Sequence, residues 1–190
     1  MAGTLSVQKI QGLASSATPT VVEVSSGHTL VQPGMVLQVV NGSYDTTVSA
    51  TSSTFVDTGL SASITPKFAT SKILVNVCQN GFQKSAHDTS AKHILLRGSS
   101  EISILATPLG YNASTNTEVS ATSGITLLDS PNTTNATTYK TQFCRISGGG
   151  TVYFQTSTSG QSKSTITLVS IVTGKQYHHQ KFYKIEFCKL

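Results

Sequence analysis

Only a few side chains in this sequence have types and spacings suited to metal binding or acid–base chemistry. His87-Asp88 and His93 form one group, and the adjacent pair His178-His179 forms another. A zinc site needs three or four ligands at suitable spacing and a second shell, and neither group has such companions. Adjacent side chains on a strand point to opposite faces, so the histidine pair would not share one ion. We therefore expect no metal site and no bound cofactor.

Motifs for hydrolysis and phosphate chemistry are missing from the sequence as well. It has no G-x-S-x-G nucleophile elbow, no HExxH and no phosphate-binding P-loop. The carboxylates are spread singly from Glu23 to Glu186, without a local pair suited to glycoside cleavage. We predict a protein that is not an enzyme, and a depolymerase or another hydrolase remains the alternative.

The composition points to a β protein of one domain. The chain has 190 residues, of which 37% are hydrophobic and 11% charged, whereas charged residues make up about a quarter of an average soluble domain. Ser and Thr replace them, and the scarcity of strong helix formers excludes an all-α fold. No apolar run approaches the roughly 18 residues of a membrane span. Residues 1–11 lack a basic stretch followed by an apolar core, so we expect no secretory signal.

The net charge of +5 does not indicate nucleic-acid binding. The 13 Lys and Arg residues are scattered, and the densest patch is Lys175, Lys181, Lys184 and Lys189 near the C-terminus. The aromatic residues do not alternate with basic ones as a base-stacking surface requires. We expect at most weak attraction to an acidic surface.

The three cysteines, Cys78, Cys144 and Cys188, are widely spaced and include no CxxC pair. We expect them to be reduced and to serve as small apolar residues in strands. A disulfide between two neighbouring strands is the alternative.

Alternation of apolar and polar residues predicts strands through the middle of the chain. Lys72–Gln79 is the clearest, and Met35–Val40 is expected to end at a turn formed by Asn41-Gly42. Gly98-Ser-Ser is predicted to form a hairpin turn between strands at 93–97 and 101–104. This pattern predicts an all-β fold, an antiparallel β-sandwich of jelly-roll type.

Three zones are expected along the chain. Residues 1–33 read as an extended N-terminal arm with short strands, residues 34–172 as the sandwich, and residues 173–190 as a tail. The tail is either an extra edge strand at 184–188 or a contact segment. Segments rich in Ser, Thr and Asn are expected to be surface loops, and they are Gln83–Lys92, Ala106–Ser123 and Ser157–Ser164.

Several strings occur between residues 33 and 172, in this order: Pro33–Val40, Phe55–Pro66, Ser71–Val75, Leu95–Ser99, Leu127–Pro131 with Thr138–Lys140, and Ser164–Leu168. These strings resemble a β-sandwich module of virion structural and tail-fibre-like proteins of tailed bacteriophages, of the marine and cyanobacterial type. The segments Leu5–Gln11 and Ser26–Leu30 are similar to the short N-terminal segments of phage fibre proteins. In physical terms, Asp57 and Asp129 are expected to accept backbone N–H groups at strand ends.

The resemblance implies a virion structural protein, a tail-fibre or tail-attachment component that assembles in the host cytoplasm and is exposed on the particle. It also implies a homotrimer with other virion proteins as partners. The alternatives are a capsid decoration (cement) protein that stabilises the head, and a carbohydrate-binding receptor module. For the last, the sequence has no Trp and offers only Tyr44, Tyr111 and Tyr153 as exposed aromatics.

Two sets of contact residues follow from this interpretation. Leu5, Val7, Ile10 and Leu13 would anchor the arm on a partner, because a short arm cannot bury them alone. The candidate receptor-facing residues, which would meet a host surface glycan, lie in the two longer loops and are His87, Asp88, Tyr111 and Asn112.

Overall fold

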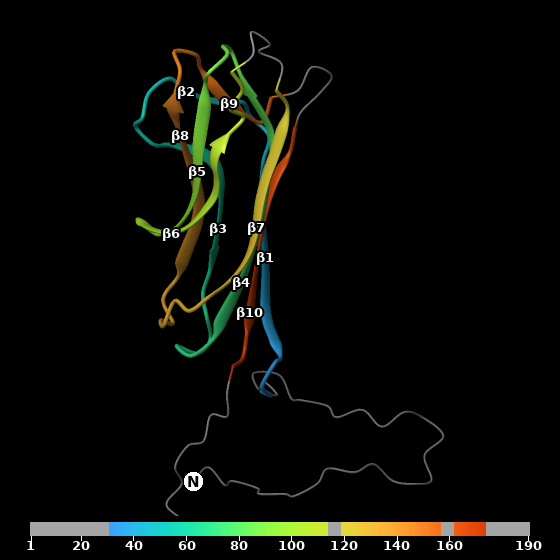
Figure 1. Ribbon diagram of the computed structural model, residues 1–190. Helices are drawn as coiled ribbons and strands as arrows, with labels where there is room; N and C mark the ends of the chain where they lie inside the picture. Colours follow the sequence, from blue (N-terminus) through green and yellow to red (C-terminus); the bar gives the residue numbers. More distant parts are fainter. Residues whose placement is uncertain (1–30, 114–118, 157–161, 174–190) are drawn as a thin grey trace, which may run out of the picture. The chain divides into compact units, whose positions relative to one another are not determined.

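The computed structural model describes residues 31–113, 119–156 and 162–173, and in these ranges the regular elements are all β-strands (Figure 1). The strands are β1 (Val36–Tyr44), β2 (Val48–Ala50), β3 (Val56–Ile64), β4 (Lys72–Lys84), β5 (Ser90–Arg97), β6 (Ser100–Leu109), β7 (Ala121–Asp129), β8 (Thr137–Ser147), β9 (Val152–Phe154) and β10 (Ser164–Ile171). The predicted arm anchors Leu5, Val7, Ile10 and Leu13, the His178-His179 pair and the predicted tail strand lie outside the described residues. The described part contains no helix long and apolar enough to cross a membrane.

The strands form two antiparallel sheets that pack face to face as a sandwich (Figure 1). The first sheet has the order β1-β10-β4-β7, and the short strands β9 and β2 join it along the far end of β4. The second sheet has the order β3-β8-β5-β6. Strict alternation of buried and half-buried residues along β10 shows why the chain forms these layers, since one side of each strand faces the core.

The strand pairing is nested, which is the signature of a jelly roll. The strand β1 pairs with β10, β3 with β8, β4 with β7, and β5 with β6. The first long strand therefore pairs with the last, and each inner pair lies within the one outside it. The predicted jelly-roll sandwich is confirmed.

The core has two apolar clusters separated by buried polar side chains. Leu60, Val77 and Tyr139 belong to the first cluster, and Phe82 and Phe143 belong to the second. Between them along β3, β4 and β8 stand three polar residues, Thr58, Gln79 and Thr141, each with no exposed surface. The Thr141 hydroxyl donates to Gln79 Oε1 at 3.0 Å, and Gln79 Nε2 donates to Ser164 Oγ at 3.2 Å. The hydrogen bonds satisfy groups whose burial would otherwise cost stability.

Of the two turns predicted from the sequence, one is wrong and the other is confirmed. The predicted turn at Asn41-Gly42 is wrong, because β1 runs through both residues and pairs with β10. Gly42 is required there for close packing, since a Cβ atom would lie 2.2 Å from the carbonyl oxygen of Ser61. The predicted hairpin between β5 and β6 is confirmed, and Gly98 adopts a φ of +59° in it.

The loops between the strands are shorter than the sequence suggests. The predicted loop Gln83–Lys92 shrinks to residues 85–89, because β4 continues to Lys84 and β5 begins at Ser90. The predicted loop Ala106–Ser123 begins only after Leu109, because β6 continues through Pro108. Pairing with neighbouring strands extends these segments beyond their apolar cores. Cys78 and Cys144 are both free thiols. Cys78 is half-buried, and Cys144 is buried.

The sandwich has two distinct ends. The backbone N–H of Gly34 donates to the Val172 carbonyl at 2.7 Å, so the chain enters and leaves the sandwich at one end. The strand β4 starts at that end, where Lys72 pairs with Ile171, and runs for 13 residues to Lys84. At about 3.3 Å per residue, the loops that follow β4 are roughly 40 Å away from the entry point. Figure 1 shows the loop between β4 and β5 at the end of the sandwich opposite to the start of β1 and the end of β10.

Candidate functional site

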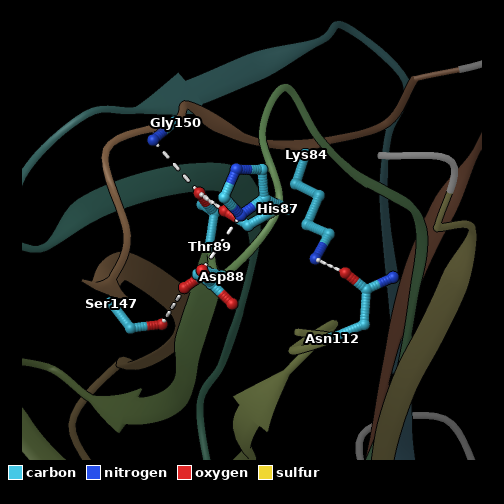
Figure 2. Close-up of polar contacts among 7 residues, drawn as sticks. All are labelled: Lys84, His87, Asp88, Thr89, Asn112, Ser147 and Gly150. Atoms are coloured by element: carbon cyan, nitrogen blue, oxygen red, sulfur yellow. Dashed lines mark hydrogen bonds and ion pairs between the residues drawn. The ribbon is translucent and has the colours of Figure 1, made fainter. Parts of the chain in front are cut away.

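Three of the candidate receptor-facing residues, His87, Asp88 and Asn112, lie together at the loop end of the sandwich (Figure 2), and Tyr111 directly precedes Asn112 in the chain. The backbone N–H of Asp88 donates to the Asn112 carbonyl at 2.9 Å, which joins the loop after β4 to the segment after β6. His87 Nδ1 and Asp88 Oδ2 are 2.9 Å apart, and both side chains are about half exposed (55% and 47%). Tyr111 is 54% exposed. The structure therefore brings the predicted residues of both loops to one surface, which we call the loop-end surface: His87, Asp88, Tyr111 and Asn112.

Residues that the sequence analysis missed hold this surface in place. Lys84, only 6% exposed, donates from Nζ to Asn112 Oδ1 at 2.8 Å. Ser147 Oγ donates to the Asp88 carbonyl at 2.7 Å, and the Gly150 N–H donates to Thr89 Oγ1 at 3.1 Å. Asp88 itself has a φ of +55°. The signal that could have revealed this support is the Gly148-Gly-Gly150 run, whose glycines let the chain approach the loop closely.

Glycine is required at two positions under this surface. A Cβ atom on Gly148 would lie 2.6 Å from Thr89 Oγ1 and 2.7 Å from the Asp88 carbonyl oxygen. A Cβ atom on Gly150 would lie 2.7 Å from the same hydroxyl. The loop thus rests directly on backbone, which fixes the positions of His87 and Asp88 from below.

Chemically, the loop-end surface can donate and accept hydrogen bonds and can stack an aromatic ring against a ligand. The imidazole, carboxylate and phenol groups are accessible, and the amide of the half-buried Asn112 lies beside them with its Oδ1 bonded to Lys84. Such a set suits a hydroxyl-rich ligand, since each group offers a directional donor or acceptor. Among the residues that the structure describes, no three His, Cys, Asp or Glu side chains gather closely enough to hold a metal ion.

The other aromatic candidates for carbohydrate contact are unavailable. Tyr44 is half-buried and packs against the first apolar cluster. Gly59 lies directly beneath the Tyr44 ring, because a Cβ atom there would be 2.3 Å from it. Tyr153 is half-buried in β9. Tyr111 alone of the three is exposed, so of these candidates it is the ring best placed to stack on a sugar.

A second polar cluster lies between the sheets and unites several of the strings that carry the phage resemblance. Asp129 at the end of β7 accepts two hydrogen bonds from Arg97 Nη1 at 2.9 Å and one from Tyr139 Oη at 2.6 Å. Arg97 also donates to the Ser130 carbonyl at 3.2 Å, and Lys72 Nζ donates to Ser130 Oγ. Burial, together with the bond to Asp129, raises the pKa of Tyr139. We call Arg97, Asp129 and Tyr139 the inter-sheet clamp.

The expected backbone role of the two aspartates is therefore corrected. The Asp129 carboxylate accepts hydrogen bonds from Arg97 and Tyr139, which belong to the opposite sheet. Asp57 accepts from Lys140 Nζ at 2.9 Å and from Gln142 Nε2 at 2.8 Å, both on the neighbouring strand. Burial opposes ionisation of Asp57, but these two partners outweigh it and lower its pKa. The resembling strings contribute contacts between strands, and their carboxylates have structural partners.

Replacing the carboxylate of the inter-sheet clamp is expected to destabilise the fold. Asp129→Asn leaves the Arg97 charge without its counter-ion, and the Asp129 side chain is only 12% exposed. Because Arg97 is itself about one-third exposed, we expect a loss of about 2 kcal/mol in the free energy of unfolding, below the value for a fully buried pair. Urea unfolding measures it. The exposed pair Lys92–Glu101 supplies the control, and a loss for Glu101→Gln equal to that for Asp129→Asn would contradict the assignment.

Comparisons with known proteins identify no family for this chain. No family model and no curated protein sequence matches it. Among solved structures, the crystal structure of the infectious bursal disease virus VP2 subviral particle is similar with 14% sequence identity and a TM-score of 0.46, over 72% of this chain and 38% of that one. The crystal structure of the T13 particle of the same virus is similar with 10% identity and a TM-score of 0.45, over 82% of this chain and 44% of that one. The chain thus spans less than half the length of each, and similarity at this level assigns no function to it.

Proposed function

We propose that this chain is a non-enzymatic structural protein of a bacteriophage virion, exposed on the particle as a tail-fibre or tail-attachment component. The observation that carries the proposal is the separation of the two ends of the sandwich. The chain enters and leaves beside Gly34 and Val172, and the loop-end surface lies roughly 40 Å away along β4. The resemblance of residues 33–172 to phage virion modules supports the same function.

Such an arrangement suits a protein that is held at one end and makes contacts at the other. The two terminal segments, residues 1–30 and 174–190, join the sandwich in the chain next to Gly34 and Val172, so an anchor formed by residues 1–30 would hold that end on the particle. Leu5, Val7, Ile10 and Leu13 remain the residues proposed to anchor it. The loop-end surface would then project away from the attachment point.

The rigidity of the loop-end surface supports a role in recognition. Lys84, Ser147 and Gly150 tie the loop to strands on both sheets. A surface that is already ordered loses less conformational entropy when it binds. We propose a glycan of the host surface as its ligand, with His87, Asp88, Tyr111 and Asn112 as the contacting residues.

A capsid decoration protein is the alternative that shares this geometry. A cement protein would also attach at one end and expose its loops, so the location on the particle separates the two. Gold labelling of intact particles with an antibody against the chain decides between them. Label at the tail or its fibres supports the proposal, label across the head favours the cement function, and absence of the chain from particles overturns both.

Removal of the arm tests the proposed anchor. Deleting residues 1–32 is expected to leave a folded sandwich, because the core and both sheets lie beyond it. The truncated chain should no longer be incorporated into particles, which immunoblotting of purified virions measures. The double variant H87A/Y111A is the matched control: it should be incorporated normally and should reduce adsorption to host cells. Normal incorporation of the truncated chain would contradict the anchor.

A further inference from the structure

The outward side of the first sheet carries an apolar row that crosses four strands. Ile73, Val75 and Val77 of β4 face the core, so Leu74 between them faces outward. Leu74 lies opposite Leu128 of β7 on one side and Val169 of β10 on the other. Val169 in turn lies opposite Val39 of β1. Directly opposed residues share a face of an antiparallel sheet, so these four side chains form one continuous row.

The two outer residues of this row are exposed, the two inner residues, Leu74 and Val169, are half-buried, and the row is extended at the end where the chain enters. Val39 is 60% exposed and Leu128 is 55% exposed. Val36 and Ile171 are the next opposed pair, and Val36 is 51% exposed. We call the set the apolar band: Val36, Val39, Leu74, Leu128, Val169 and Ile171. The exposed residues lie on the outer strands β1 and β7, and the half-buried Leu74, Val169 and Ile171 connect them across β4 and β10. Opposed aliphatic residues of this kind form a patch, whereas single exposed apolar residues are ordinary.

The rest of this outward face is polar and nearly free of charge. The row next to the apolar band consists of Asn41, Thr167, Asn76 and Thr126, and it is bonded within itself. Asn41 Nδ2 donates to Thr167 Oγ1 at 2.9 Å, and Asn76 Nδ2 donates to Thr126 Oγ1 at 2.8 Å. Lys72, at the margin of the face, is the charged residue among the outward positions of the four strands, and its ammonium group donates to Ser130.

The outward face of the second sheet differs sharply. Lys140 pairs with Asp57 at 2.9 Å, and Lys92 pairs with Glu101 at 3.4 Å. This distribution of charges is typical of a solvated surface. The two outward faces of the sandwich therefore differ in their content of charged side chains.

We propose that the apolar band is the surface through which this chain binds a second copy of itself. The chain carries a net charge of +5, so two copies repel each other over most of their surface. The outward face of the first sheet is the place where two copies can approach with almost no charge between them. A partner recognised through its own charges would find no counter-charges on this face.

The size of the face is sufficient for a stable contact. Four strands about 4.8 Å apart and nine residues at about 3.3 Å per residue give roughly 550 Å² of flat area. Side chains roughen that surface, so two copies would bury on the order of 1,200 Å² in total, which reaches the lower limit for specific interfaces. This interface goes beyond the proposed function. It would form whether the chain is located at the tail or on the head of the particle.

Introduction of charge into the apolar band of the full-length chain provides the test. We compare V39K/L128K and V39E/L128E with the wild type by sedimentation equilibrium over a range of concentrations. The wild type should self-associate, and each double variant should raise the dissociation constant about 100-fold or more. An equimolar mixture of the two variants should restore association, because lysines of one copy then meet glutamates of the other. Restoration in the mixture identifies a second copy as the occupant.

Two controls keep the test specific. Ile104, which is 45% exposed on the second sheet, gives the matched variant I104K, which should associate like the wild type. Thr126→Lys alters the polar row without removing an apolar side chain and should also weaken association. Circular dichroism checks that each variant is folded. A wild type that is monomeric at all concentrations overturns the proposal, as does association that V39K/L128K leaves unchanged. A monomeric wild type whose V39K/L128K variant melts at a lower temperature would show that the chain's own segments cover the band.

Discussion

Acidification from about pH 7 to about pH 4.5 is expected to destabilise the protein steadily, and His93→Gln is expected to remove most of that dependence. His93 lies in β5 with no exposed surface. Its ring packs against Phe154 with 4.7 Å between ring centroids, and Nδ1 is 2.7 Å from Ser123 Oγ. The other ring nitrogen, Nε2, is buried without a hydrogen-bond partner in the described residues. A charged imidazole would present an unpaired N–H group at that atom.

The direction of the effect follows from the pKa. Burial lowers the pKa of His93 from its ordinary value of 6.5 to about 3. Below pH 6.5 the unfolded chain takes up a proton at this residue, whereas the folded chain does not until about pH 3. The contribution of His93 to stability is therefore fully present above pH 6.5 and is lost as the pH falls toward 3. The free energy of unfolding should decrease by roughly 1 kcal/mol per pH unit in this interval, because uptake of a single proton can change it by at most about 1.4 kcal/mol per pH unit.

Urea unfolding at a series of pH values measures this slope. His87→Gln is the matched control, because His87 is exposed and its replacement should leave the slope unchanged. His93→Gln should show a weaker dependence on pH even if it is less stable at pH 7. Equal slopes for the wild type and His93→Gln would show that the buried imidazole does not limit stability in acid.

Truncation of Phe154 is expected to be the most destabilising single substitution in the second apolar cluster. The Phe154 ring is fully buried, and its centroid lies 5.0 Å from that of Phe143 and 5.5 Å from that of Phe82. These rings come from β9, β8 and β4, so one side chain joins both sheets near the loop end. We expect Phe154→Ala to lower the free energy of unfolding by about 3–5 kcal/mol, since it removes a large buried side chain and leaves a cavity.

Thermal and urea unfolding measure the loss, and the neighbouring residue supplies the control. Tyr153 is half-buried and points to the other side of β9, so Tyr153→Ala should cost clearly less. Hydrogen exchange offers a second readout: amides of residues 85–89 should exchange faster in Phe154→Ala, because β9 pairs with the end of β4 just before that loop. Equal losses for the two variants would show that the ring packing is not critical.

The loop-end surface was only partly predictable. The sequence places His87, Asp88, Tyr111 and Asn112 in polar segments, and in the structure His87 and Tyr111 are exposed whereas Asp88 and Asn112 are half-buried. That Asp88 and Asn112 share a hydrogen bond is a result of the sandwich, which brings the ends of β4 and β6 together. The sequence does not predict that Lys84 holds Asn112 in place, because Lys84 lies in a segment whose residues are typical of a loop.

The inter-sheet clamp was also only partly predictable from the sequence. The strings around Arg97, Asp129 and Tyr139 stand out in the sequence, and their aspartate was expected to bond to nearby backbone. The structure instead joins the three residues across the two sheets. Residues 97 and 129 are 32 positions apart, and no local pattern encodes a bond over that distance.

Two features of this protein were determined by the sequence alone. Alternation of apolar and polar residues specified strands, because a half-buried strand has a period of two, and low charge with few helix formers excluded helices. Gly98 specified the hairpin between β5 and β6, because glycine readily adopts positive φ. Tertiary structure decided which strands pair, as in the contact of Asn41 with Thr167 over 126 positions. It also decided that Asn41-Gly42 continues a strand, that one outward face carries an apolar band, and that the loops meet far from the chain's entry, because each of these depends on neighbours that are distant in sequence.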